Sequence, residues 1–204
     1  MDKKYIRNAA KPIGSLGRRR VEEMNAHHAQ LVEWAFSFLD RQEGLSCLDL
    51  GCGGGATISF LLEKKKAAFC CGVDYSKVAV EEARKKNIAF LKNGRCRIEK
   101  ADVSSLPFEE ESFDFVSAVE TLYFWPDPGK ALLEANRVMK QGGKMIIANE
   151  DDGSDAAKAN WLKSLMPEMR FYDARQLKAL LLQAEFKNVE SHSKGSWVVA
   201  IAEK

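Results

Sequence analysis

The feature that most constrains the fold of this chain is a short apolar segment that runs directly into a cluster of glycines. Residues 46–56 read SCLDLGCGGGA, and the apolar part is typical of a buried strand. Glycines allow a sharp turn and let a ligand lie against the main chain without interference from a Cβ atom. The following residues, 57–65, have a helical pattern, so free N–H groups of a helix start are expected beside the turn. This arrangement is typical of a nucleotide-cofactor site at the carboxyl end of a parallel strand.

Two kinds of cofactor site share this arrangement, and Asp49 distinguishes them. Gly51, Gly53 and Ala56 satisfy the G-x-G-x-x-A pattern of dinucleotide-binding turns, which is a weak signal by itself. A carboxylate two residues before the first glycine would face the pyrophosphate of a dinucleotide and repel it, whereas it suits a cationic amine. The segment therefore favours a cofactor with a cationic group, and a nicotinamide dinucleotide is the alternative.

The rest of the chain alternates between strand-like and helix-like segments. We expect strands at residues 47–50, 67–73, 96–100, 113–119 and 144–148, with helices at 57–65, 77–86 and 129–139. A loop replaces the helix at 103–111. Helices at 151–166 and 173–184 precede two strands, 188–193 and 196–203, which flank Lys194 and Gly195 as in a hairpin. This order predicts a doubly wound α/β sheet of seven strands, mostly parallel, with one antiparallel strand from the C-terminal hairpin.

Three acidic residues fall at the carboxyl ends of consecutive predicted strands: Asp49, Asp74 and Asp102. In a parallel sheet these ends line one edge, so the three carboxylates converge on one crevice. Asp74 is placed to accept both ribose hydroxyls. Asp102 suits an adenine amino group, with the Val103 N–H available for a ring nitrogen. The alternatives are helix capping for Asp74 and turn formation for Asp102.

The glycine segment resembles motif I, D-x-G-x-G-x-G, of the class I methyltransferases that use S-adenosylmethionine. All four positions are filled, by Asp49, Gly51, Gly53 and Gly55. The resemblance covers roughly residues 45–204 and is closest to the small type-11 methyltransferase domain. It implies a Rossmann-like sheet of seven strands with the last one inserted antiparallel, as the terminal hairpin also suggests, and it implies S-adenosylmethionine as the cofactor.

The same resemblance implies a set of cofactor-binding residues. Asp49 and Gly51 would hold the methionine portion, Gly53 would allow close approach, and Glu120 would lie under the methionine and sulfonium. The full set is Asp49, Gly51, Cys52, Gly53, Asp74, Tyr75, Asp102, Val103 and Glu120. Tyr75, Asp102 and Val103 would flank the adenine. One departure is that many relatives carry a histidine in the loop after strand four, and this loop, ETLYFW, has none.

The catalytic group is not assigned by the sequence. A general base is needed only if the acceptor loses a proton during transfer, and His28, Tyr123 and Glu150 are unranked candidates. Phe124 and Trp125, with Tyr123, form either an aromatic wall for a cationic donor or ordinary packing. The acceptor would fit between the N-terminal helix, this loop and residues 151–172, which favours a small molecule.

Three other functions stay open. The first is an RNA- or protein-modifying methyltransferase that uses the basic N-terminal arm, the second a nicotinamide-dependent oxidoreductase, and the third a cofactor-binding protein without catalysis. The arm carries seven Lys and Arg residues within its first 20 against Asp2, yet the net charge of the 204 residues is only +2. Nucleic acid is therefore not the expected partner.

The N-terminal part is predicted to stand apart from the cofactor-binding core. Residues 11–17 are rich in turn-forming residues, and residues 18–39 are helix-like, as one helix or as two broken at Asn25. We expect residues 1–44 to form a lid and helical segment and residues 45–204 to form the S-adenosylmethionine-binding domain. Within the first part, residues 1–25 are either a mobile lid or a disordered tail.

Composition excludes several other classes. Five cysteines without C-x-x-C spacing argue against a disulfide framework or a zinc site, and His27 and His28 lack further ligands at matched spacing. No signal peptide or membrane-spanning run is present, so a reduced, cytoplasmic protein is expected. The oligomeric state is not predicted.

Overall fold

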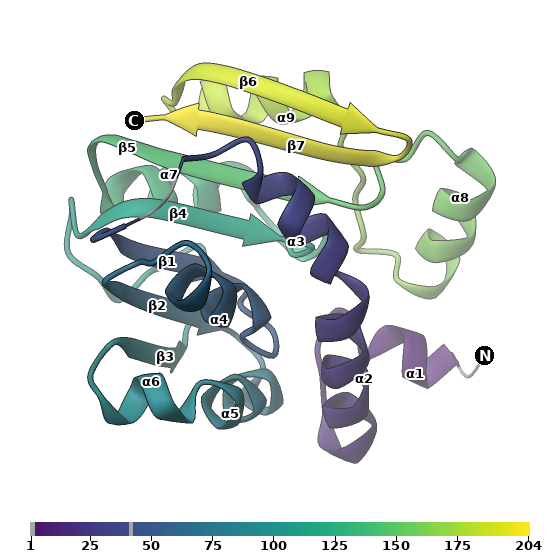
Figure 1. The fold of residues 1–204 in the computed structure, drawn as a ribbon. Helices are drawn as coiled ribbons and strands as arrows, with labels where there is room; N and C mark the ends of the chain where they lie inside the picture. Colours follow the sequence, from purple (N-terminus) through teal and green to yellow (C-terminus); the bar gives the residue numbers. More distant parts are fainter. Residues whose placement is uncertain (1–2, 41–42) are drawn as a thin grey trace.

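A seven-stranded sheet forms the centre of the computed structural model, which describes residues 3–40 and 43–204 (Figure 1). The strand order is β3-β2-β1-β4-β5-β7-β6. The strands are β1 (Ser46–Leu50), β2 (Phe69–Asp74), β3 (Cys96–Lys100), β4 (Phe113–Val119), β5 (Met139–Asn149), β6 (Lys187–Lys194) and β7 (Trp197–Glu203). β1 to β5 pair in parallel, and β7 runs antiparallel between β5 and β6. The predicted fold class is confirmed.

Helices cover both faces of the sheet, because successive strand residues point to opposite sides. On one face, Leu48 and Leu50 pack with α7 (Pro128–Val138) and α9 (Ala174–Gln183). On the other, Cys47 packs with α3 (Ala29–Phe36), α4 (Ala56–Glu63) and α5 (Lys77–Lys86). The short α6 (Ile88–Lys92) follows α5, and α8 (Ala156–Leu165) lies beyond the end of the sheet (Figure 1). The strand order reverses between β1 and β4, which is where such sheets bind ligands.

Several boundaries differ from the sequence prediction. β5 begins at Met139, which pairs with Phe113, so Gly142 and Gly143 lie within the strand and do not end a helix. α6 was not anticipated. The absence of a helix between β3 and β4 agrees with the prediction for 103–111.

The prediction of irregular structure for residues 11–17 is confirmed for residues 11–13 and wrong for residues 14–17, which are helical. The described chain begins with α1 (Lys3–Arg7), and α2 (Gly14–His27) already starts within that segment. α2 packs closely on the loop before it, since a Cβ on Gly17 would lie 2.7 Å from the Pro12 carbonyl carbon. Residues 18–39 belong to two helices, as one of the two predicted alternatives had it, but the break between α2 and α3 falls at His28 and not at Asn25. Residues 1 and 2 of the predicted lid lie outside the described residues.

α3 contributes to the core, although it precedes the predicted boundary at residues 44 and 45. Its side chains Leu31, Val32, Ala35 and Phe36 are buried, and the Phe36 ring packs against Phe60 and Phe115. The division into two parts stays a prediction. Of the three N-terminal helices, α1 and α2 lie outside the layer that α3 forms on the sheet (Figure 1).

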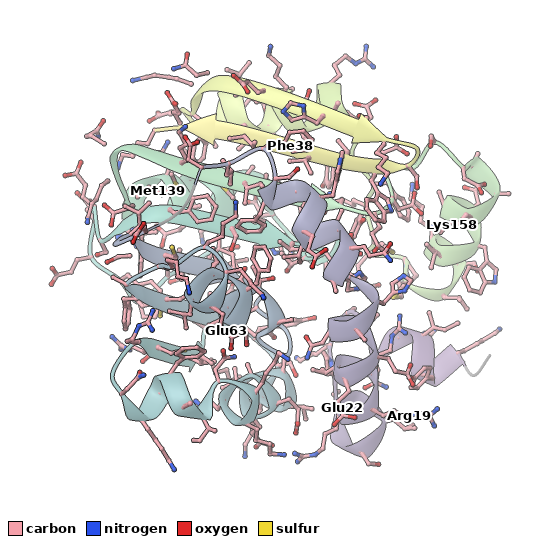
Figure 2. The ribbon with its side chains drawn as sticks, in the orientation of Figure 1. Arg19, Glu22, Phe38, Glu63, Met139 and Lys158 are labelled. Atoms are coloured by element: carbon pink, nitrogen blue, oxygen red, sulfur yellow. The ribbon has the colours of Figure 1, made fainter. Side chains whose placement is uncertain are left out.

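Most of the N-terminal cations described by the structure are engaged within the protein. Arg18 forms ion pairs with Glu81 and Glu82 of α5, at 3.1 and 2.9 Å. Arg19 lies on the outer surface of α2, near Glu22 (Figure 2), and pairs with Glu23. Arg20 lies 3.9 Å from Glu23 and also lines a cavity. Among residues 3–40 and 43–204, no helix combines the length and apolar character needed to cross a bilayer.

Candidate active site

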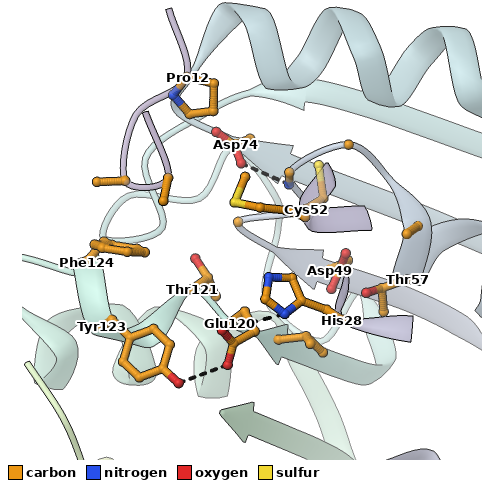
Figure 3. Close-up of a pocket in the computed structure, with 18 of the residues that line it drawn as sticks. Pro12, His28, Asp49, Cys52, Thr57, Asp74, Glu120, Thr121, Tyr123 and Phe124 are labelled. Carbon is orange, nitrogen blue, oxygen red and sulfur yellow. Dashed lines mark hydrogen bonds and ion pairs between the residues drawn. The ribbon is translucent and has the colours of Figure 1, made fainter. Parts of the chain in front are cut away.

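A cavity of about 390 Å³ lies at the carboxyl ends of the central parallel strands (Figure 3). All nine residues proposed from the sequence line it: Asp49, Gly51, Cys52, Gly53, Asp74, Tyr75, Asp102, Val103 and Glu120. They come from the ends of β1, β2, β3 and β4, which confirms that the acidic series converges. α1, α2 and α8 also contribute to the walls.

The glycine turn shapes the floor of the cavity at two positions. Gly51 has φ +68°, and a Cβ there would lie 1.9 Å from Thr121 Oγ1, so only glycine lets the loop after β4 approach this closely. Gly53 has φ +51°, and the space that its Cβ would occupy is open. A ligand can therefore lie against the backbone at Gly53. Cys52, between them, is buried, and burial raises the pKa of its thiol well above the ordinary value.

Asp49 is a buried carboxylate at the end of β1. Its Oδ1 accepts a hydrogen bond of 2.6 Å from the Ser117 hydroxyl of β4. Burial raises its pKa to about 7, and the Ser117 hydrogen bond offsets only part of that effect. No Lys or Arg side chain pairs with it among the described residues. A cationic group in the cavity would supply the missing charge.

Asp74 is held rigidly by two backbone N–H groups. Its Oδ2 accepts from Gly53 N at 3.0 Å, and its Oδ1 accepts from Ser76 N at 2.8 Å. The N-cap of α5 is Ser76, not Asp74, so the capping alternative for Asp74 does not hold. Burial raises the pKa of Asp74, and the two hydrogen bonds oppose that rise. Each oxygen retains a lone pair, so the carboxylate can still accept from a diol.

The residues proposed to flank an adenine lie at the rim. Tyr75 is 41 % exposed, and its hydroxyl donates to the Ala10 carbonyl at 2.5 Å. Asp102 is exposed, and its Oδ1 accepts from Ser104 N at 2.8 Å, which is the turn geometry given as the alternative reading. Asp102 also lines the cavity beside Val103. Its role in the turn is therefore compatible with a position beside an adenine.

Glu120 is at the centre of a buried polar network after β4. Its backbone has φ +57°, a conformation that residues other than glycine seldom adopt. Residues in such conformations cluster at functional sites. Glu120 Oε1 accepts from the Tyr123 hydroxyl at 2.9 Å and from the Glu150 N–H. Burial raises the pKa of Glu120, although nearby His28 opposes the rise.

Two histidines from the end of α2 reach the acidic residues after β4 and β5. His28 Nδ1 lies 3.3 Å from Glu150 Oε1 and 3.8 Å from Glu120 Oε2, and His27 Nε2 lies 3.1 Å from Glu150 Oε2. Burial lowers the pKa of His28, but the two carboxylates outweigh it and leave the pKa raised. Burial raises the pKa of Glu150, yet the histidine contacts leave it below its ordinary value.

The sequence shows no metal-ligand spacing, yet the fold brings one ligand atom each of His27, His28 and Glu150 within 4.8 Å of one another. Their N···O separations are those of directly contacting ion pairs. His28 lines the cavity, whereas His27 and Glu150 are not among its lining residues. We interpret the group as ion pairs around one cavity-facing imidazole.

The loop after β4 supplies the aromatic wall. Tyr123, Phe124 and Trp125 all line the cavity, and Trp125 Nε1 donates to Thr121 Oγ1 at 3.2 Å. Tyr123 and Trp125 are also buried, so the ring cluster packs and lines the site at once.

Sequence reasoning placed the N-terminal helix and residues 151–172 beside the acceptor but did not identify which of their side chains line the cavity. An apolar roof is formed by Ile6 of α1 and by Leu162, Met166 and Met169 in and after α8. Arg20 and Asn25 of α2 also face the cavity. No local signal marks these residues, because their position depends on how α1 and α8 pack on the loop after β4.

An open, doubly wound sheet with a glycine turn and acidic side chains at its switch point defines an α/β protein that binds a nucleotide-type cofactor. Comparison with known proteins narrows this class. A family model described as a methyltransferase domain matches residues 48–147. A sterol 4-C-methyltransferase from Caenorhabditis elegans is 31% identical over 147 residues, which are 71% of this chain and 41% of that protein. An O-methyltransferase from Pyrenophora dematioidea is 32% identical over 151 residues, 72% of this chain and 56% of that protein.

Solved structures agree on the fold. The chain bound by the Trm112 methyltransferase activator in a complex from Haloferax volcanii superposes with a TM-score of 0.81 at 20% identity, covering 100% of this chain and 98% of that one. An S-adenosylmethionine-dependent methyltransferase from Aquifex aeolicus gives 0.73 at 18% identity, covering 91% and 97%. The chain spans about half the length of the curated relatives that it matches. The chain therefore carries, over residues 48–147, the methyltransferase domain that this family model describes, on a fold shared with S-adenosylmethionine-dependent methyltransferases of solved structure.

The described residues fit the cofactor of this family. The open space over Gly53 accepts a ligand against the backbone, and the uncompensated carboxylate of Asp49 suits a cationic amino acid portion. Asp74 suits a ribose diol. A dinucleotide would instead place its pyrophosphate beside Asp49, where the charges repel.

Proposed function

We propose that this protein transfers a methyl group from S-adenosylmethionine to a small, largely apolar acceptor. The observation that carries the proposal is the continuity of one cavity from the carboxylates of Asp49 and Asp74 to the apolar roof of Ile6, Met166 and Met169. The acidic end suits the cofactor, and the apolar end suits the acceptor. Methyl transfer from an activated sulfonium needs mainly alignment and exclusion of water, which an enclosed site provides.

The cofactor contacts proposed from the sequence remain the best assignment. Asp49, Gly51 and Cys52 would surround the methionine portion, with Glu120 beneath it, and Gly53 would leave room for the ligand. Asp74 would hold the ribose, and Tyr75, Asp102 and Val103 the adenine. Their shared position on the cavity walls supports this set.

The acceptor is proposed to be a small molecule because Ile6, Met166 and Met169 line the same cavity as the cofactor residues and limit the space beside them. The similar proteins include a sterol 4-C-methyltransferase and an O-methyltransferase, which is consistent with an apolar acceptor. The paired state of Arg18 and Arg19 argues against the alternative of nucleic acid capture by the basic arm. A cytoplasmic location stays a prediction.

The segment formed by α1, its following loop and the start of α2 is proposed to act as a lid. Two side chains beside Asp74 hold it, since Tyr75 donates to the Ala10 carbonyl and Ser76 donates to the Pro12 carbonyl at 2.7 Å. Arg7 Nε donates to the Leu165 carbonyl at 2.9 Å on the α8 side. These few polar contacts can be remade after a ligand enters.

The proposal is tested by thermal unfolding and calorimetry with S-adenosylmethionine, S-adenosylhomocysteine and NAD. A ligand at 100 times its dissociation constant adds about 2.7 kcal/mol to the free energy of unfolding. We expect both adenosyl compounds to raise the melting temperature and NAD to leave it unchanged. A shift with NAD alone would contradict the proposal.

The matched variant for this test is Asp74→Asn, which keeps an oxygen for one backbone N–H but removes the charge. Hydrogen bonds to charged groups contribute about 1.5–3 kcal/mol, so affinity for S-adenosylhomocysteine is expected to fall about 10-fold or more. Equal affinity of variant and wild type would assign Asp74 a structural role only.

A further inference from the structure

One ring nitrogen of His28 faces the acidic network and the other faces the cavity. The Nδ1 side lies 3.3 Å from Glu150 and 3.8 Å from Glu120. Figure 3 shows the second ring nitrogen on the side away from Glu120, directed into the space bounded by Thr121 and Cys52. We infer that His28 is the general base that removes the proton of an acceptor hydroxyl, and that Glu150 is the positioning residue that holds its ring. The inference rests on the proposed function and deepens it.

The other two candidate bases are engaged elsewhere. The Tyr123 hydroxyl donates to Glu120 Oε1 and accepts from Asp151 N at 2.9 Å, and burial raises its pKa well above the ordinary value. Glu150 contacts both histidine rings and is not among the residues that line the cavity. His28 therefore combines a basic nitrogen with access to an acceptor.

The charged groups around His28 favour its protonated form after proton transfer. Glu120 faces it from the end of β4 and Glu150 from the end of β5, while Arg20 of α2 opposes them. His27 shares Glu150, and Lys158 of α8 lies near the same carboxylates through its ion pair with Asp151. The two carboxylates prevail, so the pKa of His28 is raised. A base with a pKa near the working pH is the most effective.

The reaction balances without a further reactant. The acceptor oxygen forms a bond to the methyl carbon, and the carbon–sulfur bond breaks with its electron pair remaining on sulfur. The hydroxyl proton passes to His28 Nε2. The products are a methyl ether and the neutral thioether S-adenosylhomocysteine, and the positive charge moves to the imidazolium beside Glu150.

This role defines the acceptor class more narrowly. An alcohol or a phenol must lose its proton as the new bond forms, so it needs the base. A neutral amine attacks with its lone pair and loses a proton only afterwards. The apolar roof together with His28 therefore points to an apolar compound with a hydroxyl group.

The first experiment needs no acceptor. The chain has three histidines, so nitrogen-15 NMR resolves their tautomers, and the variants His28→Asn and His27→Ala assign the signals. Neutral His28 is expected to carry its proton on Nδ1, toward Glu150, with Nε2 bare. Glu150→Gln is expected to lower the pKa of His28. A wild-type tautomer with the proton on Nε2 would overturn the inference.

The second experiment measures turnover of 2-naphthol and 2-naphthylamine as probe acceptors with S-adenosylmethionine. His28→Asn, whose amide can still donate to Glu150, is expected to lower 2-naphthol methylation by about 100-fold or more and to leave 2-naphthylamine within a few fold. The control His192→Ala removes a ring that stacks on Phe38 and is not among the residues lining the cavity, so it should change neither rate. Glu150→Gln should move the rising limb of the pH profile for 2-naphthol to lower pH.

Two results would overturn the inference even with a folded variant, as judged by its melting temperature. One is 2-naphthol methylation within 10-fold of wild type in His28→Asn. The other is loss of wild-type activity with a chelator and recovery with Mn²⁺, which would assign His27, His28 and Glu150 to a metal. If neither probe is methylated, the tautomer of neutral His28 measured by NMR tests the inference by itself. Failure to bind S-adenosylmethionine by calorimetry would contradict the proposed function instead, and leaves the tautomer result unaffected.

Discussion

At the scale of single residues, Asp49 is a buried carboxylate in the cofactor site without a cationic partner among the described residues. The carboxylate is buried at the end of β1 with one hydroxyl donor, Ser117, and no paired cation among the described residues. Burying a carboxylate without a partner is unfavourable, and the group responds through its pKa. A cationic ligand offsets the free-energy cost of burying this carboxylate. Asp49 therefore contributes to ligand affinity because it has no ion-pair partner in the free protein.

Asp49 gives a prediction on pH and stability. Its pKa is about 7 in the folded protein against an ordinary value of 3.8. The folded state therefore holds a proton that the unfolded chain releases between about pH 4 and 7, and the stability linked to this proton is lost as pH rises to 7. Asp49→Asn, which still accepts from Ser117, should be more stable than wild type at pH 8, by at most about 4 kcal/mol.

The difference between the two proteins should shrink at pH 5.5, as measured by urea unfolding without cofactor. The comparison cancels Asp74 and Glu120, whose raised pKa values are common to both proteins. A variant that is less stable than wild type at pH 8 would show that Asp49 is ionised and favourably solvated.

The acidic residues of the cofactor site could be predicted from the sequence because they come directly after strands, and strands are recognised by their apolar pattern. Placing Asp49, Asp74 and Asp102 required only the positions of three strands, whereas Glu120 was implied by the family resemblance. The importance of His28 could not be ranked, since its partners Glu120 and Glu150 come from distant strands and the break between α2 and α3 aims its ring. The roof residues Met166 and Met169 carry no pattern of their own.

At the scale of elements, the N-terminal helices divide into two kinds. α3 is packed on the sheet, with Phe36 fully buried between aromatic rings. α1 and the loop to α2 are held by hydrogen bonds from Tyr75 and Ser76 at the cavity rim, by Arg7 on the α8 side and by Ile6 in the apolar roof. The predicted segment of residues 1–44 thus joins a lid to part of the core, and apolar periodicity alone could not separate them.

A core substitution tests the assignment of α3. Phe36→Ala should lower the free energy of unfolding by about 3–5 kcal/mol, because it removes a buried ring and leaves a cavity. The matched control is Ile13→Ala at a position that is 66 % exposed, where the change should stay within about 0.5 kcal/mol. Urea unfolding measures both. Equal small effects would place α3 outside the core.

Hydrogen exchange tests the lid. Local opening has a low free energy where few buried contacts hold a segment. Backbone amides of residues 5–13 are expected to exchange much faster than those of Leu31 to Phe36 in the free protein. Binding of S-adenosylhomocysteine should slow the first group and leave the second unchanged. Slow exchange of both groups in the free protein would make the first segment a fixed part of the fold.

At the scale of the whole molecule, several basic side chains of the N-terminal arm lie in ion pairs with acidic side chains and do not form a separate basic surface. Part of the charge of the basic arm is compensated within the fold, since Arg18 pairs with Glu81 and Glu82 of α5 and Arg19 pairs with Glu23. Arg20 turns toward the cavity. The sequence showed the run of cations but could not show the acidic residues that the fold places against it.

A labelled single-stranded RNA should accordingly bind weakly, with a dissociation constant no tighter than the 10⁻⁴–10⁻⁶ M typical of non-specific association at physiological salt. Fluorescence anisotropy measures it. Submicromolar binding that weakens in Arg19→Ala would revive the nucleic-acid alternative.

All five cysteines of the chain are buried and unpaired. Burial raises the pKa of each thiol: to about 11 for Cys96, to about 12 for Cys47 and Cys71, and well above the ordinary value for Cys52 and Cys70. The reactive thiolate is correspondingly scarce. The native protein is therefore already a suitable background for single-site labelling. A cysteine introduced at Ile13, on the exposed loop before α2, would be the one thiol that a maleimide dye meets quickly, and its fluorescence would follow the opening of that segment in real time.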